Sequence, residues 1–292
     1  MASITSIALN GVGAFGVGIG ILISGCGPTP PGGVGGAGGG GGSPGTCSYT
    51  THQTATYASG WARNAAFVGG TMYYPTNAQG TFGGVVILPG FISPASMMAA
   101  WGPFLATRGM AAFIVDPPSG GDPPTTRSRA QLAALESLKA ENDRVGSPLR
   151  GKLNVNAMAV AGWSMGGGGT LHSANSNPAG LKAAVAWAPW ELATNFPNAR
   201  VPSIILTGGN ADALVNAGMS KAEYNSIPAT TSKAYVEFQG ADHFQWTSPN
   251  GVSGRAGAFT WAWLNAYVNG NADCKSVIAR GTGMTDFASS AL

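Results

Sequence analysis

Charged side chains are scarce in this sequence. Asp, Glu, Lys and Arg make up only 9% of its 292 residues, whereas about 25% is typical of soluble domains. The formal net charge of +3 is spread thinly, and no cluster of Lys and Arg supplies the basic surface that phosphate binding needs. The composition therefore argues against nucleic acid as a partner. It leaves Ser, Thr, Asn and the backbone to make the surface polar.

The start of the chain lacks charge altogether. Residues 4–23 contain no Asp, Glu, Lys or Arg and are mostly apolar, which suits either a membrane span or a signal peptide. The run ends at Ile23-Ser24-Gly25-Cys26, a junction that resembles a bacterial lipoprotein box. We interpret residues 1–26 as a lipoprotein-type signal with Cys26 lipidated, although residues 1–10 carry no Lys or Arg. An ordinary secretory signal and an uncleaved anchor are the alternatives, and all three export the protein.

Cysteine is also rare, with three in the chain. Cys26 belongs to the junction above, which leaves Cys47 and Cys274 near the two ends of the folded region. A disulfide between them would suit an oxidising compartment and would tie those ends together. Two unpaired thiols, or pairing of Cys274 outside this chain, are the alternatives.

Residues 27–46 are so rich in Gly and Pro that they predict a linker rather than a folded segment. From residue 47 to 292, apolar β-branched runs alternate with helix-like stretches, which is typical of a single α/β domain with helices on both faces of a mostly parallel sheet. We expect an α/β-hydrolase fold. The predicted strands lie near 72–74, 85–88, 112–115, 157–161, 183–187, 203–206 and 234–238, and the predicted helices near 95–107, 127–142, 165–175 and 257–268.

The sequence Gly-Trp-Ser-Met-Gly at residues 162–166 follows a predicted strand and opens a predicted helix. A nucleophilic serine on a sharp strand-to-helix turn needs glycine on both sides, because side chains there would clash. The same pattern at residues 41–45 lies in polyglycine with no strand before it and is attributed to composition. Ser164 is therefore the predicted nucleophile.

Few side chains are available to activate this serine. Of the three histidines, His52 precedes the sheet, and His172 lies about 12 Å along the helix that Ser164 opens. His243 follows a predicted strand and is the remaining base. Asp212 follows the strand near 203–206 and is our choice for the acid that orients His243, with Glu191 as the alternative.

The negative charge that develops on an ester oxygen requires fixed donors close to the serine. The usual pair is the amide that follows the nucleophile and one in the loop after the third strand. In this sequence these are the backbone N–H groups of Met165 and Phe91.

Several motifs resemble the bacterial cutinase and PET hydrolase family of polyester hydrolases. They are Thr-Met-Tyr-Tyr-Pro-Thr-Asn at 71–77, Leu-Pro-Gly-Phe at 88–91, Trp-Gly-Pro at 101–103, the run from 162 to 169, and Ala-Pro-Trp at 188–190. The resemblance spans about residues 72–274. It implies the same roles for Ser164, Asp212 and His243.

The resemblance also implies an exposed aromatic cleft. Its residues would be Phe91, Trp163, Met165 and Trp190, which would hold the ester unit. Phe244, directly after the histidine, resembles the cutinases rather than the PET-active members with Ser at that position. One departure concerns the family's C-terminal disulfide, whose second cysteine is downstream, whereas no cysteine follows Cys274 here.

Only about a dozen residues separate Trp190 from the strand that begins near residue 203, where lipases insert a lid, so we expect an open site. These features together predict an exported, monomeric serine esterase that cleaves polyester or cutin-like esters through an acyl-enzyme on Ser164. It requires no cofactor and no metal, and it meets a membrane only through lipid on Cys26. A carboxylesterase of small soluble esters and a non-catalytic surface lipoprotein are the alternatives.

The interpretation of the N-terminus leads to a simple test. Replacing Cys26 by Ala removes the thiol that would be lipidated, so the Cys26→Ala protein should leave the membrane fraction of an expressing bacterium. Immunoblots of separated membrane and soluble fractions measure this. Unchanged partitioning would contradict the tether.

Overall fold

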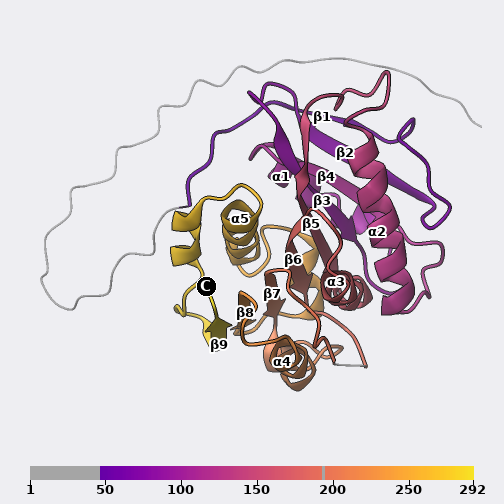
Figure 1. The fold of residues 1–292 in the computed structure, drawn as a ribbon. Coiled ribbons are helices and arrows are strands. Elements are labelled where there is room, and N and C mark those ends of the chain that lie inside the picture. The colour runs from indigo at the N-terminus through magenta and orange to yellow at the C-terminus, as the bar shows by residue number, and fades with distance from the viewer. Residues whose placement is uncertain (1–46, 193–194) are drawn as a thin grey trace, which may run out of the picture. The chain divides into compact units, whose positions relative to one another are not determined.

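A nine-stranded sheet runs through the part of the chain that the structure describes (Figure 1). The computed structural model describes residues 47–192 and 195–292. The predicted signal at 1–26, Cys26 and the linker at 27–46 lie outside the described residues. In spatial order the strands are β1 (Thr54–Tyr57), β2 (Gly69–Pro75), β4 (Ala111–Asp116), β3 (Phe82–Leu88), β5 (Leu153–Trp163), β6 (Leu181–Trp187), β7 (Ser203–Thr207), β8 (Lys233–Phe238) and β9 (Met284–Ser290).

The central strands, from β4 across β3, β5, β6 and β7 to β8, are parallel, and antiparallel strands lie at both edges. Every residue of β3 and of β7 is buried. Continuous apolar runs of this kind are expected where both faces of a sheet are covered. The predicted mostly parallel sheet is therefore confirmed.

Helices cover both faces of the sheet. On one face lie α2 (Pro124–Ala140), α3 (Met165–Asn175) and α4 (Ala217–Ser226), and on the other lie α1 (Trp101–Ala106) and α5 (Arg255–Tyr267) (Figure 1). Alternate residues of one strand enter different cores, as Ala159 and Val160 of β5 do. Short 3-10 segments complete the elements: η1 (Ala95–Met98), η2 (Gly209–Ala211), η3 (His243–Thr247) and η4 (Ala272–Val277). The arrangement is that of the α/β-hydrolase fold.

The helix predicted over residues 95–107 is interrupted. It is divided into η1 and α1, with Ala99 and Ala100 between them. Pro103 has no N–H group, so it fits only in the first turn of a helix, where no intrahelical acceptor is needed. Starting α1 at Trp101 places Pro103 in that first turn.

Three elements were not predicted from the sequence. They are β1 and β9, at the two edges of the sheet, and α4, which packs against β7 and β8. β1 and β9 are edge strands whose residues are half-buried or exposed, so they lack the apolar signal that marks a central strand. α4 is only weakly amphipathic, and its clearest start signal is the side chain of Asn216, which accepts a hydrogen bond from the N–H of Met219 at 2.9 Å.

The connection from β6 to β7 contains no helix or strand among its described residues, 188–192 and 195–202. The expectation that no lid domain is inserted there is consistent with this. Among the described residues, no helix has the length and hydropathy that a membrane span requires.

Cys47 and Cys274 form a disulfide across 227 positions of sequence. Cys274 is 0% exposed and lies in η4. The bond therefore joins the beginning of the described chain to η4. The pairing that the sequence favoured is therefore confirmed. Cys274 thus pairs with a cysteine that precedes the first strand, β1.

Removing this link should lower stability. A Cys47→Ser/Cys274→Ser variant loses a constraint on the unfolded chain, so its free energy of unfolding should fall by about 2–5 kcal/mol. Urea unfolding monitored by tryptophan fluorescence measures the change. The wild type unfolded with a thiol reductant present should match the variant, and an unchanged unfolding midpoint in both would contradict the prediction.

Candidate active site

Ser164 lies on the sharp turn between β5 and α3. Its φ of 57° is positive, an uncommon conformation for a residue with a side chain. A Cβ on Gly162 would overlap the carbonyl oxygen of Gly166, and a Cβ on Gly166 would lie 2.5 Å from the carbonyl oxygen of Leu88. Glycine is therefore required on both sides of Ser164, as the sequence pattern predicted.

The carboxylate of Asp212 and the imidazole of His243 are in contact. Oδ2 of Asp212 lies 2.8 Å from Nδ1 of His243, and both residues are nearly buried. The other oxygen, Oδ1, accepts hydrogen bonds from the N–H groups of Leu214 and Val215 at 2.9 and 2.8 Å. The backbone thus fixes the orientation of the carboxylate. A proton on Nδ1 satisfies this contact and leaves Nε2 unprotonated and able to act as a base.

Trp163 connects the serine turn to the histidine. Its indole N–H donates a 2.8 Å hydrogen bond to the backbone carbonyl of His243, and its ring lies 5.1 Å from the imidazole, centroid to centroid. Because Trp163 precedes Ser164 directly, this contact holds the imidazole beside the turn. The side chain is only 2% exposed. The expectation that Trp163 forms part of an exposed cleft is therefore wrong, because its ring is packed beneath the histidine.

The hydroxyl of Ser164 forms no hydrogen bond with a residue in 47–192 or 195–292. Contacts between nucleophile and base are often loose without substrate and tighten in the Michaelis complex. The structure thus places His243 and Asp212 within hydrogen-bond distance of each other. Ser164 directly follows Trp163, whose indole N–H binds the His243 carbonyl.

Two backbone donors are available near the serine. Met165 is the first residue of α3, where the N–H has no partner within the helix. Among the described residues the N–H of Phe91 also makes no hydrogen bond. Gly90 brings the Phe91 loop against the serine, since a Cβ on Gly90 would lie 2.9 Å from the Cβ of Ser164. The amides named from the sequence are therefore both unoccupied donors near the nucleophile.

Apolar side chains surround this region. Phe91 is 53% exposed, while Met165 and Trp190 are half-buried, and Trp190 packs in part against the core. Two further exposed side chains, Leu214 and Phe244, follow Asp212 and His243 closely in sequence. Leu214 was not predicted from the sequence. The signal that was available is its position two residues after the predicted acid.

The comparisons with known proteins agree with this geometry. A family model described as PETase, PET hydrolase-like, matches residues 39–288. The chain belongs to the PET hydrolase-like family. It is 38% identical over 205 residues to a bis(hydroxyethyl) terephthalate hydrolase of Streptomyces coelicolor, covering 70% of this chain and 63% of that protein.

Cutinases are similar to the same degree. Cutinase est2 of Thermobifida alba is 37% identical over 204 residues, covering 70% of this chain and 65% of the cutinase. Cutinase 1 of Thermobifida cellulosilytica is 36% identical over 206 residues, covering 70% and 75%. The chain thus spans slightly less than two thirds of the length of the first two of these relatives.

In this PET hydrolase-like chain the alternative acid is engaged elsewhere. Glu191 pairs with Nε2 of His172 on α3 rather than with His243. The described residues also contain no group of three or more His, Cys, Asp and Glu side chains arranged to hold a metal ion.

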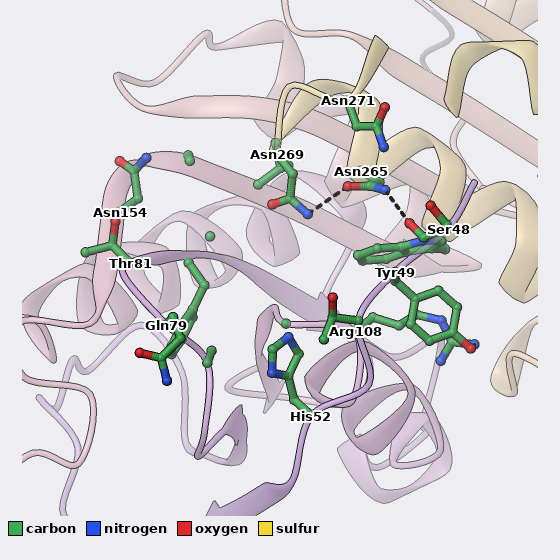
Figure 2. Close-up of a pocket in the computed structure, with 18 residues that line it drawn as sticks. Ser48, Tyr49, His52, Gln79, Thr81, Arg108, Asn154, Asn265, Asn269 and Asn271 are labelled. Atoms are coloured by element: carbon green, nitrogen blue, oxygen red, sulfur yellow. Dashed lines mark hydrogen bonds between the residues drawn. The ribbon is translucent and has the colours of Figure 1, made fainter. Parts of the chain in front are cut away.

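A large hollow in the PET hydrolase-like chain lies away from Ser164. It has a volume of about 590 Å³ and is lined mainly by polar side chains, among them His52, Gln79, Arg108, Asn154 and Asn269 (Figure 2). Phe82 at the start of β3 and Asn154 near the start of β5 place it at the amino ends of these strands. Ser164 lies at the opposite, carboxyl end of β5.

Glu223 on α4 is a buried acid close to the Asp212 loop. The residue is 0% exposed, and neither carboxylate oxygen has a hydrogen-bond partner among the described residues. Burial raises its pKa well above the ordinary value, and the nearby carboxylate of Glu191 adds to the effect. Because the side chain of Glu223 is buried and unpaired, its ionisation would place an uncompensated charge inside the fold.

The raised pKa predicts a dependence of stability on pH. Above the unfolded value of about 4.5, unfolding releases the proton of Glu223, so the free energy of unfolding falls as pH rises toward the folded pKa. A Glu223→Met variant escapes this loss. Its stability advantage over the wild type should be larger at pH 8 than at pH 4 by about 1–3 kcal/mol.

Thermal unfolding at both pH values measures the difference. The matched control is Glu136→Met on α2, where the side chain is 65% exposed. This control should gain no stability between pH 4 and pH 8. A Glu223→Met variant that behaved in the same way would contradict the buried, unpaired state of the acid.

Proposed function

We propose that this chain is a serine ester hydrolase that acts on polyester or cutin-like esters through an acyl-enzyme on Ser164. The observation that carries the proposal is the buried Asp212–His243 contact of 2.8 Å, held beside the strained serine turn by Trp163. A carboxylate that orients an imidazole, with a serine beside it, is an arrangement that supports acyl transfer. The names of the similar proteins, a terephthalate ester hydrolase and cutinases, support the same chemistry.

In the first half of the reaction, Oγ of Ser164 attacks the ester carbonyl while Nε2 of His243 takes its proton. The N–H groups of Phe91 and Met165 donate to the oxyanion of the tetrahedral intermediate. The C–O bond to the alcohol then breaks, and His243 gives its proton to the departing alkoxide. Asp212 keeps the imidazole oriented and stabilises its charged form.

In the second half, water attacks the acyl-enzyme and His243 again accepts the proton. The second tetrahedral intermediate occupies the same two amides, and its collapse releases the carboxylic acid and restores Ser164. Apart from water, every step uses side chains and amides of this chain. The proton that His243 takes from water returns to Oγ of Ser164.

The surroundings of the site support a bulky, apolar substrate. Phe91, Leu214 and Phe244 are exposed by 53%, 61% and 57%, and apolar and aromatic side chains beside a site favour apolar ligands. The described part of the β6–β7 connection forms no lid over them. A chain segment of a polymer can therefore approach from solvent without a closing motion.

We further propose that the protein works outside the cytoplasm. The Cys47–Cys274 disulfide supports an oxidising compartment, because such bonds persist in exported proteins. In this proposal residues 1–26 direct export, residues 27–46 are the linker, and residues 47–292 are the catalytic domain. The lipid on Cys26 stays a prediction from the sequence.

The test of the function is the Ser164→Ala variant. It should keep its fold, measured by thermal unfolding, and lose at least about 10³-fold in turnover of a short nitrophenyl ester. A serine-directed phosphonate should label the wild type at Ser164 and leave the variant unlabelled. The control Ser176→Ala, at the far end of α3, should be labelled and active like the wild type.

The substrate class is tested with the wild type on films of an aromatic polyester, an aliphatic polyester and cutin. Soluble acids released from a film support the proposal. Turnover of nitrophenyl ester alone would identify a small-ester carboxylesterase. A wild type that the phosphonate does not label would identify a non-catalytic protein.

A further inference from the structure

Arg127, near the start of α2, has its guanidinium fully buried. The residue is 0% exposed, and each of its three nitrogens donates to a different backbone carbonyl. Nε donates to Asp122 at 2.9 Å, Nη1 to Pro89 at 3.0 Å and Nη2 to Gly120 at 2.6 Å. Arg127 thus joins the loop after β3 to the loop between β4 and α2.

This arrangement is costly for the fold. No carboxylate lies within ion-pair distance of Arg127 among the described residues. Burial lowers its pKa to about 10, and the charge of Asp122 opposes that change. The guanidinium therefore stays charged at neutral pH. A buried charge is tolerated only where its hydrogen bonds are satisfied, and the planar fork of Arg reaches three separate acceptors, which the ammonium of Lys does not.

The loop that Arg127 holds carries the Phe91 amide. Pro89, whose carbonyl Arg127 binds, is two residues before Phe91. Directly after Phe91, Ile92 has a positive φ of 49°, a strained conformation for a β-branched residue. The N–H of Ile92 donates at 2.8 Å to the carbonyl of Gly120, the same carbonyl that accepts from Nη2 of Arg127.

Strain of this kind persists only when the surrounding structure holds it. Arg127 binds two carbonyls next to the Phe91–Ile92 turn. One belongs to Pro89, which precedes the turn, and the other belongs to Gly120, which also accepts from the N–H of Ile92. Gly120 also approaches the turn closely, since a Cβ there would lie 3.1 Å from the Cα of Ile92. The direction of the Phe91 N–H therefore depends on the guanidinium.

We propose that Arg127 is a positioning residue for ester hydrolysis, which fixes the Phe91 backbone N–H as an oxyanion donor by clamping the carbonyls of Pro89 and Gly120. This inference rests on the proposed function. It assigns a role in catalysis to a residue that does not contact the substrate. The Phe91 amide is useful only if it is held where the oxyanion forms, because a donor that must reorganise during the reaction stabilises the transition state less.

The test uses Arg127→Met and Arg127→Lys with a soluble nitrophenyl ester. Met removes the three donors and the charge, whereas Lys keeps the charge but not the fork. Both variants should lose about 10- to 100-fold in kcat, approaching the loss seen when an oxyanion donor is removed. KM should stay within about threefold of the wild type, because the donor acts on the transition state.

Glu141→Gln is the matched control for general loss of stability. Glu141 is equally buried and binds Tyr57, Arg144 and Ser147 beyond the other end of α2. It touches neither loop that Arg127 joins. This variant should unfold at a lower temperature yet keep kcat within about threefold of the wild type, when all proteins are assayed well below their melting temperatures.

Gly120→Ala tests the same loop without changing Arg127. The added methyl group pushes on the Ile92 backbone, so kcat should fall by about 3- to 10-fold while KM stays nearly unchanged. If Arg127→Met does not fold, Gly120→Ala and Arg127→Lys still test the positioning role of Arg127.

Wild-type kcat in Arg127→Met or in Gly120→Ala would overturn the positioning role. Retention of kcat by Arg127→Lys alone would overturn it as well, because the charge rather than the fork would then matter. A wild type without esterase activity would overturn the proposed function and this inference with it. An active wild type with unaffected variants would overturn only the inference.

Discussion

Close contact of backbone with backbone at the Ser164 turn is the constraint on which the rest of the molecule depends. At Gly162 and Gly166 a side chain would collide with main-chain carbonyls, and at Gly90 it would press on Ser164 itself. Strand β5, helix α3 and the loop after β3 meet there only because all three positions lack a Cβ. The positive φ of Ser164 costs about 1–3 kcal/mol, which the packing of the buried strand and helix offsets.

Main-chain groups orient the polar side chains around that turn. Two N–H groups hold the carboxylate of Asp212, the His243 carbonyl accepts from Trp163, and three carbonyls receive the guanidinium of Arg127. The chain carries little charge, yet several of its ionisable groups are buried in such contacts. Because β5, β6, β7 and β8 are adjacent and parallel, their carboxyl ends lie along one edge of the sheet. Loops that are distant in sequence converge at that edge.

The fold was predictable wherever packing imposes a strong pattern. The central strands and α3, whose bounds match the expected 165–175, have apolar runs or a clear start. The edge strands β1 and β9 escaped notice because a strand with one exposed face and one partner needs few apolar residues. The helix expected over 95–107 is divided by the demands of Pro103, a local rule that the apolar pattern concealed. Pairing of Cys47 with Cys274 was favoured by their positions at the ends of the domain.

The sequence by itself determined the serine turn, the choice of His243 among three histidines, and the strand ends from which Asp212 and Phe91 emerge, because glycine spacing and strand order are local and countable. Only the tertiary structure decided that Glu191 binds His172, that Trp163 lies beneath the imidazole rather than in an open cleft, and that Arg127 clamps two loops. These outcomes depend on which side chains from distant segments share a small buried space. A sequence pattern does not predict these contacts, because the distances and directions that select hydrogen-bond partners exist only after the chain has packed.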